Sequence, residues 1–169
     1  MYRVLMPIDE GEERVRTQVN AITRLPNAAE EVSVTLFHTF DDEEEAREAT
    51  LADIPTGSEA MDLLESEGIA VDEMTGAGDP ATEIIAASEA LGADAIVLGG
   101  RKRSKLGSML FGSVSQAVIL GAEVPVTVTG ESTRTPSHRC QSCGEAYYAT
   151  PETTIGTCRA CGGTKVETV

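Results

Sequence analysis

The sequence predicts an α/β domain with about five parallel strands, followed by a short module that carries all four cysteines. Over residues 1–130, short apolar and β-branched segments alternate with segments of helical periodicity, which is typical of βαβ units, a parallel sheet and right-handed crossovers. The polar stretch 131–137 has no periodicity and separates this region from the cysteines. We therefore expect a doubly wound α/β domain over 1–130, a linker over 131–137 and a small module over 138–169.

Each element follows from a local pattern. The expected strands are the segments 1–8, 32–39, 69–75, 95–98 and 124–128. Helices are expected between them, with apolar residues at helical spacing near Val15 to Ile22, around Met61 and Leu64, over Pro80 to Leu91 and over Gly112 to Leu120. The third helix has clear end signals, because Asp79 can cap it, Pro80 suits its first position and Gly92 can end it.

The last expected strand also suggests how two copies could meet. Its valines, Val124, Val126 and Val128, share one face, and Pro125 lies on the other. Proline has no N–H to pair with a neighbour and is tolerated mainly on edge strands. Because an edge strand can pair with a second copy, we expect a homodimer through residues 124–128.

Charge is unevenly spread along the chain. The net charge is −15, and residues 1–130 hold 24 acidic and 9 basic residues whereas 131–169 hold 4 of each. Such a surface repels phosphate backbones and anionic lipids, so we expect neither nucleic-acid nor membrane binding. Abundant acidic residues with only three lysines favour adaptation to high salt, the alternative being an ordinary acidic cytosolic protein. Without a long apolar run or a signal-peptide pattern, we expect a cytoplasmic location.

A basic cluster follows the fourth expected strand directly and consists of Arg101, Lys102, Arg103 and Lys105. Ligands of open α/β sheets bind beyond the carboxyl ends of the strands, and helix N-termini bind phosphate, so Gly112 and Ser113 at the next helix start would belong to the same pocket. The pattern indicates a phosphate site, the alternative being a solvated loop paired with nearby carboxylates. No GxxxxGK[ST] run occurs, which excludes a P-loop NTPase.

Residues 1–129 resemble the universal stress protein family. The resemblance lies in the strand that ends at Asp9 and in the segments 36–39, 78–80, 93–99, 111–114 and 124–128. It implies a five-stranded α/β fold and a dimer formed through the last strand. Nucleotide-binding members carry G-x2-G-x9-G-[ST], whose backbone and hydroxyl groups hold the ATP phosphates. Here Gly99 fills the first position and Gly112-Ser113 the last, but Lys102 stands where the second glycine belongs.

Lys102 at the position of the second glycine leaves two hypotheses about nucleotide binding open. Lysine does not readily allow the close backbone approach that glycine allows, yet Lys102 could reach a phosphate as a cation. By resemblance, Asp9 would face the nucleotide and Thr39 would lie near the adenine; otherwise they are a helix cap and a strand end. The first hypothesis is a regulatory protein that binds ATP, AMP or another phosphorylated ligand through Asp9, Thr39, Gly99, Arg101, Lys102, Arg103, Gly112 and Ser113. The second is a dimeric scaffold without nucleotide. No catalytic base or nucleophile is legible, so we expect at most slow ATP hydrolysis.

The four cysteines form two CxxCG turns 14 residues apart: Cys140 with Cys143, and Cys158 with Cys161. Two such turns complete a tetrahedral four-thiolate shell, which is the closed geometry of structural zinc. The alternatives are disulfides, which a reducing cytoplasm disfavours, and a rubredoxin-like iron site. Four thiolates already fill the shell, so we expect His138 to be a bystander. The sequence thus predicts a zinc ribbon over 138–169, which could be presented to a protein partner.

Overall fold

The computed structural model describes residues 1–100, 112–130, 136–147 and 153–168, and the chain divides into two compact units, Met1–Glu131 and Ser132–Val169. Strands and helices alternate in the first unit. Its strands are β1 (Tyr2–Pro7), β2 (Val32–Phe40), β3 (Ala70–Ala77), β4 (Ala95–Gly99) and β5 (Val126–Thr129). Its helices are α1 (Glu12–Thr23), α2 (Ala28–Glu31), α3 (Glu43–Glu48), α4 (Pro55–Ser66), α5 (Pro80–Leu91) and α6 (Ser113–Gly121), with a 3₁₀ turn η1 (Leu51–Asp53) before α4.

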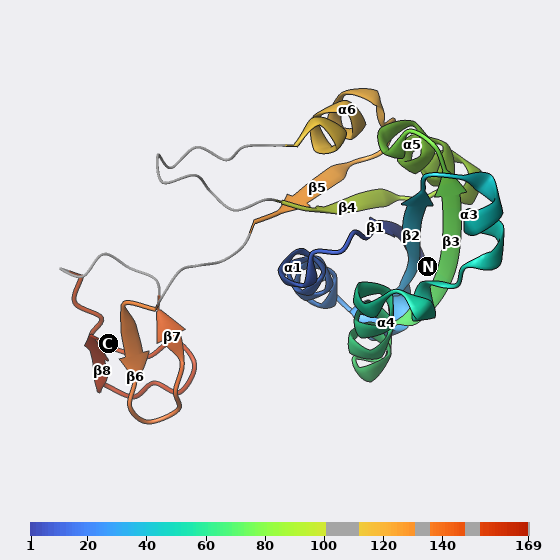
Figure 1. Ribbon diagram of the computed structural model, residues 1–169. Coiled ribbons are helices and arrows are strands. Elements are labelled where there is room, and N and C mark those ends of the chain that lie inside the picture. The colour runs from blue at the N-terminus through green and yellow to red at the C-terminus, as the bar shows by residue number, and fades with distance from the viewer. Residues whose placement is uncertain (101–111, 131–135, 148–152, 169) are drawn as a thin grey trace. The chain divides into compact units, whose positions relative to one another are not determined.

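The five strands form one parallel sheet in the order β3-β2-β1-β4-β5, which confirms the predicted α/β fold (Figure 1). The strand order reverses between β1 and β4. These two strands pair only where Val4 and Leu5 lie beside Ala95 and Ile96, so their pairing stops before their carboxyl ends. In open α/β sheets, the crevice at such a reversal is the usual ligand site.

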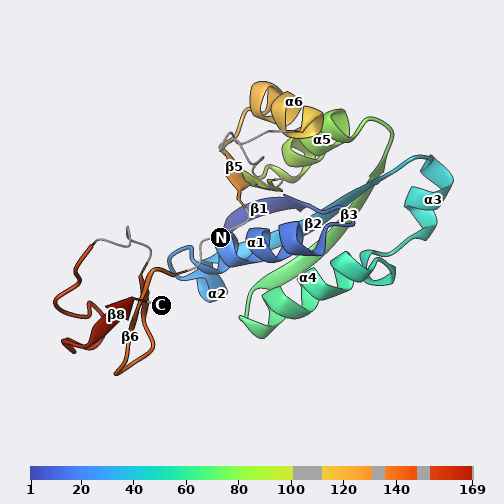
Figure 2. The same ribbon diagram turned by 60° about the vertical axis from the view of Figure 1, so that its left-hand side comes forward.

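Each face of the sheet has its own hydrophobic core, one beneath α1 and α4 and the other beneath α5 and α6 (Figure 1 and Figure 2). Successive side chains of a strand point to opposite faces. Val4 and Met6 therefore enter the α1/α4 core, while Leu5 between them enters the α5/α6 core. Four of the five residues of β4 are buried, which is typical of a strand covered on both faces.

The predicted ends of α5 are confirmed. The Asp79 carboxylate accepts hydrogen bonds from the Thr82 backbone N–H at 2.9 Å and from its hydroxyl at 2.6 Å. Pro80 occupies the first turn, and Gly92 ends the helix with a φ of +56° that side chains disfavour. These short-range signals fix where α5 begins, just beyond the carboxyl end of β3, and where it ends before β4.

The last strand differs from the prediction in extent and in surroundings. β5 begins at Val126 rather than at Val124, because Pro125 has no N–H to offer, although its carbonyl accepts from the Ile96 N–H at 2.9 Å. β5 is an edge of the sheet. Its valines are half-buried against the α5/α6 core, whereas Thr127 is exposed. The valine face therefore belongs largely to the domain's own core.

None of the described helices has the length and apolar character required to cross a membrane. The longest, α1, α4 and α5, have 12 residues each.

The second unit is a three-stranded antiparallel sheet in the order β7-β6-β8. Its strands are β6 (His138–Cys140), β7 (Ala146–Tyr147) and β8 (Val166–Thr168). Among its described residues, only Cys140, Cys158 and His138 are buried. So small a core cannot fold a module of this size unaided, and a bound metal can supply the missing stabilisation.

Candidate functional site

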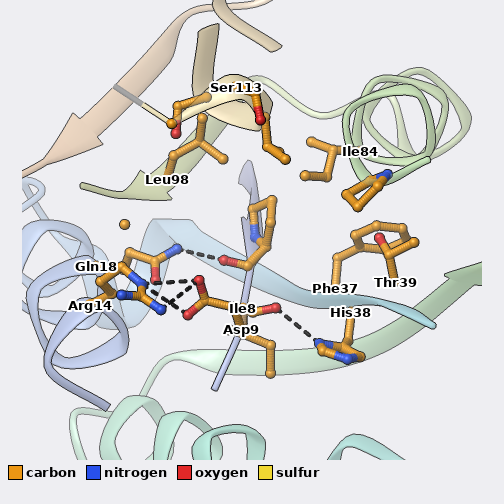
Figure 3. Close-up of a pocket in the computed structure, with 16 residues that line it drawn as sticks. Ile8, Asp9, Arg14, Gln18, Phe37, His38, Thr39, Ile84, Leu98 and Ser113 are labelled. Carbon is orange, nitrogen blue, oxygen red and sulfur yellow. Dashed lines mark hydrogen bonds and ion pairs between the residues drawn. The ribbon is translucent and has the colours of Figure 1, made fainter. Parts of the chain in front are cut away.

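A pocket of about 240 Å³ lies at the carboxyl ends of β1, β2 and β4, and the N-terminus of α6 closes part of it. This is the crevice that the reversal of strand order produces. Figure 3 shows Asp9, Arg14 and Gln18 on one side of it, and Phe37 and Ile84 on the other. The pocket thus has one polar wall and one largely apolar wall.

Gln18 on α1 joins the two parting strands. Its side-chain NH₂ donates to the Pro7 carbonyl at 2.7 Å and to the Val97 carbonyl at 2.8 Å. Gln18 is 1% exposed, and the two hydrogen bonds satisfy carbonyls near the point where the β1–β4 pairing ends. The glutamine was not predicted as a site residue, although it lies on the same helix face as Val15 and Ile22.

Asp9 lines the pocket directly after β1, at the position predicted for it. Its carboxylate accepts from the Gly11 N–H at 2.9 Å and from the Arg14 guanidinium, with Nε at 3.0 Å from both oxygens and Nη2 at 2.9 Å from Oδ2. Arg14 was missed by sequence reasoning, because nothing in the local pattern shows that this helix residue reaches back over the strand end.

The structure describes some of the predicted phosphate-binding residues. Gly99, Gly112 and Ser113 all line the pocket, with Ser113 as the first residue of α6 and Gly112 just before it. The N–H groups of a helix's first turn have no partner within the helix, so this end can accept an anion. Arg101, Lys102, Arg103 and Lys105 lie outside the described residues.

Thr39 and His38, at the end of β2, also line the pocket. His38 Nδ1 lies 3.0 Å from the Ile8 carbonyl, and because a carbonyl only accepts, Nδ1 carries the proton. The His38 ring also meets Phe40 edge to face at 4.7 Å. These contacts give His38 a packing role between the ends of β1 and β2.

The apolar wall combines an aromatic ring and aliphatic side chains at the ends of the strands with side chains from α5 and α6. The residues of this wall are Ile8, Phe37, Pro80, Ile84, Leu98 and Val114. A wall of this kind suits a flat heteroaromatic ring, and the hydroxyls of Ser113, Ser115 and Thr39 add polar atoms beside it.

In the second unit, the four cysteines meet as predicted, with their sulfur atoms all within 4.8 Å of one another. The Cys140 and Cys161 sulfurs are 3.7 Å apart and the Cys143 and Cys158 sulfurs 3.6 Å apart. In a tetrahedral zinc site with bonds of about 2.3 Å, sulfur atoms are about 3.8 Å apart. The cluster therefore fits a tetrahedral metal ion. His138 is not part of it; its Nδ1 lies 2.9 Å from the Ser137 hydroxyl.

Both cysteine turns have a glycine of positive φ directly after the second cysteine. Gly144 and Gly162 have φ of +78° and +71°, and their N–H groups donate to the carbonyls of Cys140 and Cys158 at 2.9 Å. A side chain would be strained in that conformation. Each turn thus brings a buried and an exposed cysteine to one point, the buried ones being Cys140 and Cys158.

A polar network supports one of the thiols. Hydrogen bonds, first from the Tyr147 hydroxyl and then from the backbone of Cys161 and Ala160, lower the pKa of Cys158 to about 6, which favours the thiolate that a metal needs. The same hydroxyl accepts from the Arg159 N–H at 2.8 Å. The Arg159 side chain lies over the Tyr147 ring, 5.3 Å from its centroid, and pairs with Glu145 at 2.6 Å. Such outer contacts orient metal ligands.

Comparison with known proteins identifies the first unit. The profile of the universal stress protein family matches residues 1–130. The stress response protein NhaX of Bacillus subtilis (strain 168) is 39% identical over 51 residues, which cover 30% of this chain and 31% of that protein.

Solved structures share the fold. The universal stress protein from Archaeoglobus fulgidus has 26% identity and a TM-score of 0.60 over 76% of this chain and 98% of that chain. A universal stress protein from the same organism in complex with dAMP has 22% identity and a TM-score of 0.53 over 76% and 98%. An Arabidopsis thaliana member with AMP bound has 16% identity and a TM-score of 0.58 over 79% and 94%. With its parallel sheet, switch-point pocket and matching profile, the chain belongs to the universal stress protein family.

Proposed function

We propose that this chain is a regulatory protein that binds an adenine nucleotide in the α/β domain and presents a zinc ribbon to a protein partner. The observation that carries the proposal is the pocket itself. It combines an apolar wall, the Asp9 carboxylate, Gly99 and the α6 start at Gly112 and Ser113. Apolar surface suits a base, a carboxylate accepts from sugar hydroxyls, and a helix N-terminus accepts phosphate.

Structural neighbours support this choice of ligand. Three of them were solved with cAMP, dAMP or AMP, at 16–22% identity, a level at which only the fold is shared. The residues we assign to the nucleotide are those of the sequence analysis: Asp9, Thr39, Gly99, Arg101, Lys102, Arg103, Gly112 and Ser113.

Calorimetry with ATP and AMP tests the nucleotide proposal on three proteins: the unmodified chain, Lys102→Ala and Lys102→Gly. If Lys102 contacts phosphate, Lys102→Ala weakens binding by about 1–3 kcal/mol, the scale of one charged hydrogen bond. If Lys102 is instead a lost glycine, Lys102→Gly creates or tightens binding. No heat from any of the three proteins would favour the second candidate function, a dimeric scaffold without nucleotide, which rests on the lysine at this position.

The homodimer through the β5 edge remains part of the proposal. Because Val126 is packed against the α5/α6 core, Val126→Glu would damage the domain as well as any interface. A better probe is Leu120, which is 87% exposed near the end of α6, the helix that precedes and contacts β5, and which follows Ile119 at 41%. Leu120→Glu should give monomers in light scattering, while the control Leu63→Glu, on α4, should not. A monomeric unmodified protein at micromolar concentration in high salt would contradict the proposal.

We also propose a cytoplasmic location and, on the strength of the acidic composition, adaptation to high salt. Screening would then relieve the self-repulsion of the domain. A melting temperature that rises steeply with potassium chloride up to molar concentration supports this proposal, and a flat response contradicts it.

A further inference from the structure

Arg14 is the only lysine or arginine that lines the pocket among the described residues. It comes from α1, on the side of the pocket opposite to Phe37 and Ile84 (Figure 3). The sequence pattern assigned the pocket's positive charge to the segment 101–105 instead. A cation built into α1 gives the pocket a second source of positive charge.

Two glycines leave room for the arginine. A Cβ at Gly11 would lie 2.3 Å from Arg14 Cζ, and a Cβ at Gly99 would lie 2.7 Å from Arg14 Cβ and 3.0 Å from Gln18 Oε1. These distances are too short for any side chain without a rearrangement. The loop after β1 and the end of β4 therefore admit Arg14 because both positions lack a side chain.

Asp9 pairs with the Arg14 guanidinium through only some of its N–H groups. The ion pair occupies Nε and Nη2, while Nη1 makes no hydrogen bond to any other described residue. A guanidinium has five N–H donors, so donors remain for a ligand. The Arg14 side chain is 27% exposed and that of Asp9 57%, so both are accessible from the pocket.

We propose that Arg14 is a specificity-determining residue that contacts the phosphate of the ligand, with Asp9 as its positioning partner. This inference rests on the nucleotide binding proposed above and narrows it to nucleoside phosphates over nucleosides. Arginine binds phosphate through a planar fork of charged hydrogen bonds. The neighbouring carboxylate repels a free phosphate ion but can accept from a sugar hydroxyl. The pair therefore favours a molecule that carries sugar and phosphate together.

Calorimetry with AMP and with adenosine, at one fixed salt concentration, tests the inference. Arg14→Gln should weaken AMP binding about tenfold or more and leave adenosine binding within about threefold. Arg14→Lys, which keeps the charge but not the fork, should fall between Arg14→Gln and the unmodified protein for AMP. Arg16→Gln is the matched control: Arg16 is on the same helix, pairs with Glu59 at 2.6 Å and does not line this pocket. It should leave both ligands unaffected.

Three outcomes would overturn the inference. Equal weakening of AMP and adenosine by Arg14→Gln would mean that Arg14 acts only by shaping the pocket. Unchanged AMP binding in Arg14→Gln and Arg14→Lys would remove Arg14 from ligand contact while leaving nucleotide binding intact. An unmodified protein that binds neither ligand would refute the nucleotide proposal itself. A thermal melt of each variant checks that the domain is folded in every arm.

Discussion

In the α/β domain, two hydrophobic cores flank a five-stranded sheet, whereas in the cysteine unit only Cys140, Cys158 and His138 are buried among the described residues. The domain carries the whole net charge of −15, and residues 131–169 are neutral before any metal binds. Apolar burial can thus stabilise the domain against considerable self-repulsion. The cysteine unit has no comparable hydrophobic core, so its fold depends on the four sulfur atoms that converge on one point.

The difference also decides where chemistry can occur. In the domain, the pocket arises from the order of the strands, and residues distant in sequence line it: Asp9, Phe37, Leu98 and Ser113. In the cysteine unit, each pair of ligands comes from one short turn. A site of the first kind depends on the whole sheet, and a site of the second kind depends on local turns and one ion.

The largest effect is expected from removing a metal ligand. Cys158→Ser should release the metal and unfold residues 132–169 while the α/β domain stays folded, because apparent binding energies of structural zinc, about 10–16 kcal/mol, are folding energy. Elemental analysis should give about one zinc per unmodified chain and little for the variant, and hydrogen exchange should localise the unfolding. Ser142→Ala, in the opposite cysteine turn, is the control. An unmodified protein that holds no metal would refute the zinc site.

A core substitution should have the opposite effect, because it should destabilise the α/β domain and leave the metal site intact. Leu36 is fully buried in the α1/α4 core, and Leu36→Ala should lower the free energy of unfolding of the domain by about 2–5 kcal/mol. The metal content should not change. The control Leu63→Ala, at a leucine 36% exposed on α4, should cost less than about 1 kcal/mol. Denaturant titration measures both variants, and loss of metal from Leu36→Ala would show that the two units are not independent.

A smaller effect is expected at Tyr147. Its hydroxyl is the first of the groups that lower the pKa of Cys158 to about 6. The stabilisation of the thiolate is complete above the ordinary thiol pKa and is lost as the pH falls through about 6. Tyr147→Phe raises that pKa, and the metal should be released at a higher pH. Zinc release can be followed with a colorimetric chelator from about pH 8 to 5. Tyr2→Phe, at an exposed tyrosine of the other unit, is the control. Identical release curves would contradict the role.

The smallest effect is expected at the α5 cap. Hydrogen bonds from the Thr82 side chain, and then from its backbone, lower the pKa of Asp79. Asp79→Ala should lower the melting temperature by about 2–5 °C at neutral pH. Because the pKa of Asp79 is lowered, the cap stabilises the domain at pH values above the ordinary carboxyl pKa, and this stability is lost as the pH falls through the lowered pKa. The melting temperatures of the variant and the unmodified protein should therefore converge in acid. Asp62→Ala, at an exposed position of α4, is the control, and a persistent difference in acid would contradict the cap.

The sequence by itself determined the features that depend on near neighbours. The alternation of strands and helices, the cap and C-terminal glycine of α5, and the two CxxCG turns each involve residues a few positions apart, and the structure confirms them. Charge and propensity act locally in these cases, so a pattern is enough to recognise them.

Only the tertiary structure decided which distant groups meet. Gln18 hydrogen-bonds to Val97, 79 positions away, and Tyr147 lies beside Cys158 across the cysteine unit. Arg14 reaches the pocket because Gly11 and Gly99 leave space that no pattern around Arg14 reveals. The valines of β5 face inward because α5 and α6 cover that side of the sheet. Such contacts depend on how packed elements fill space, and periodicity within one element carries no information about its neighbours.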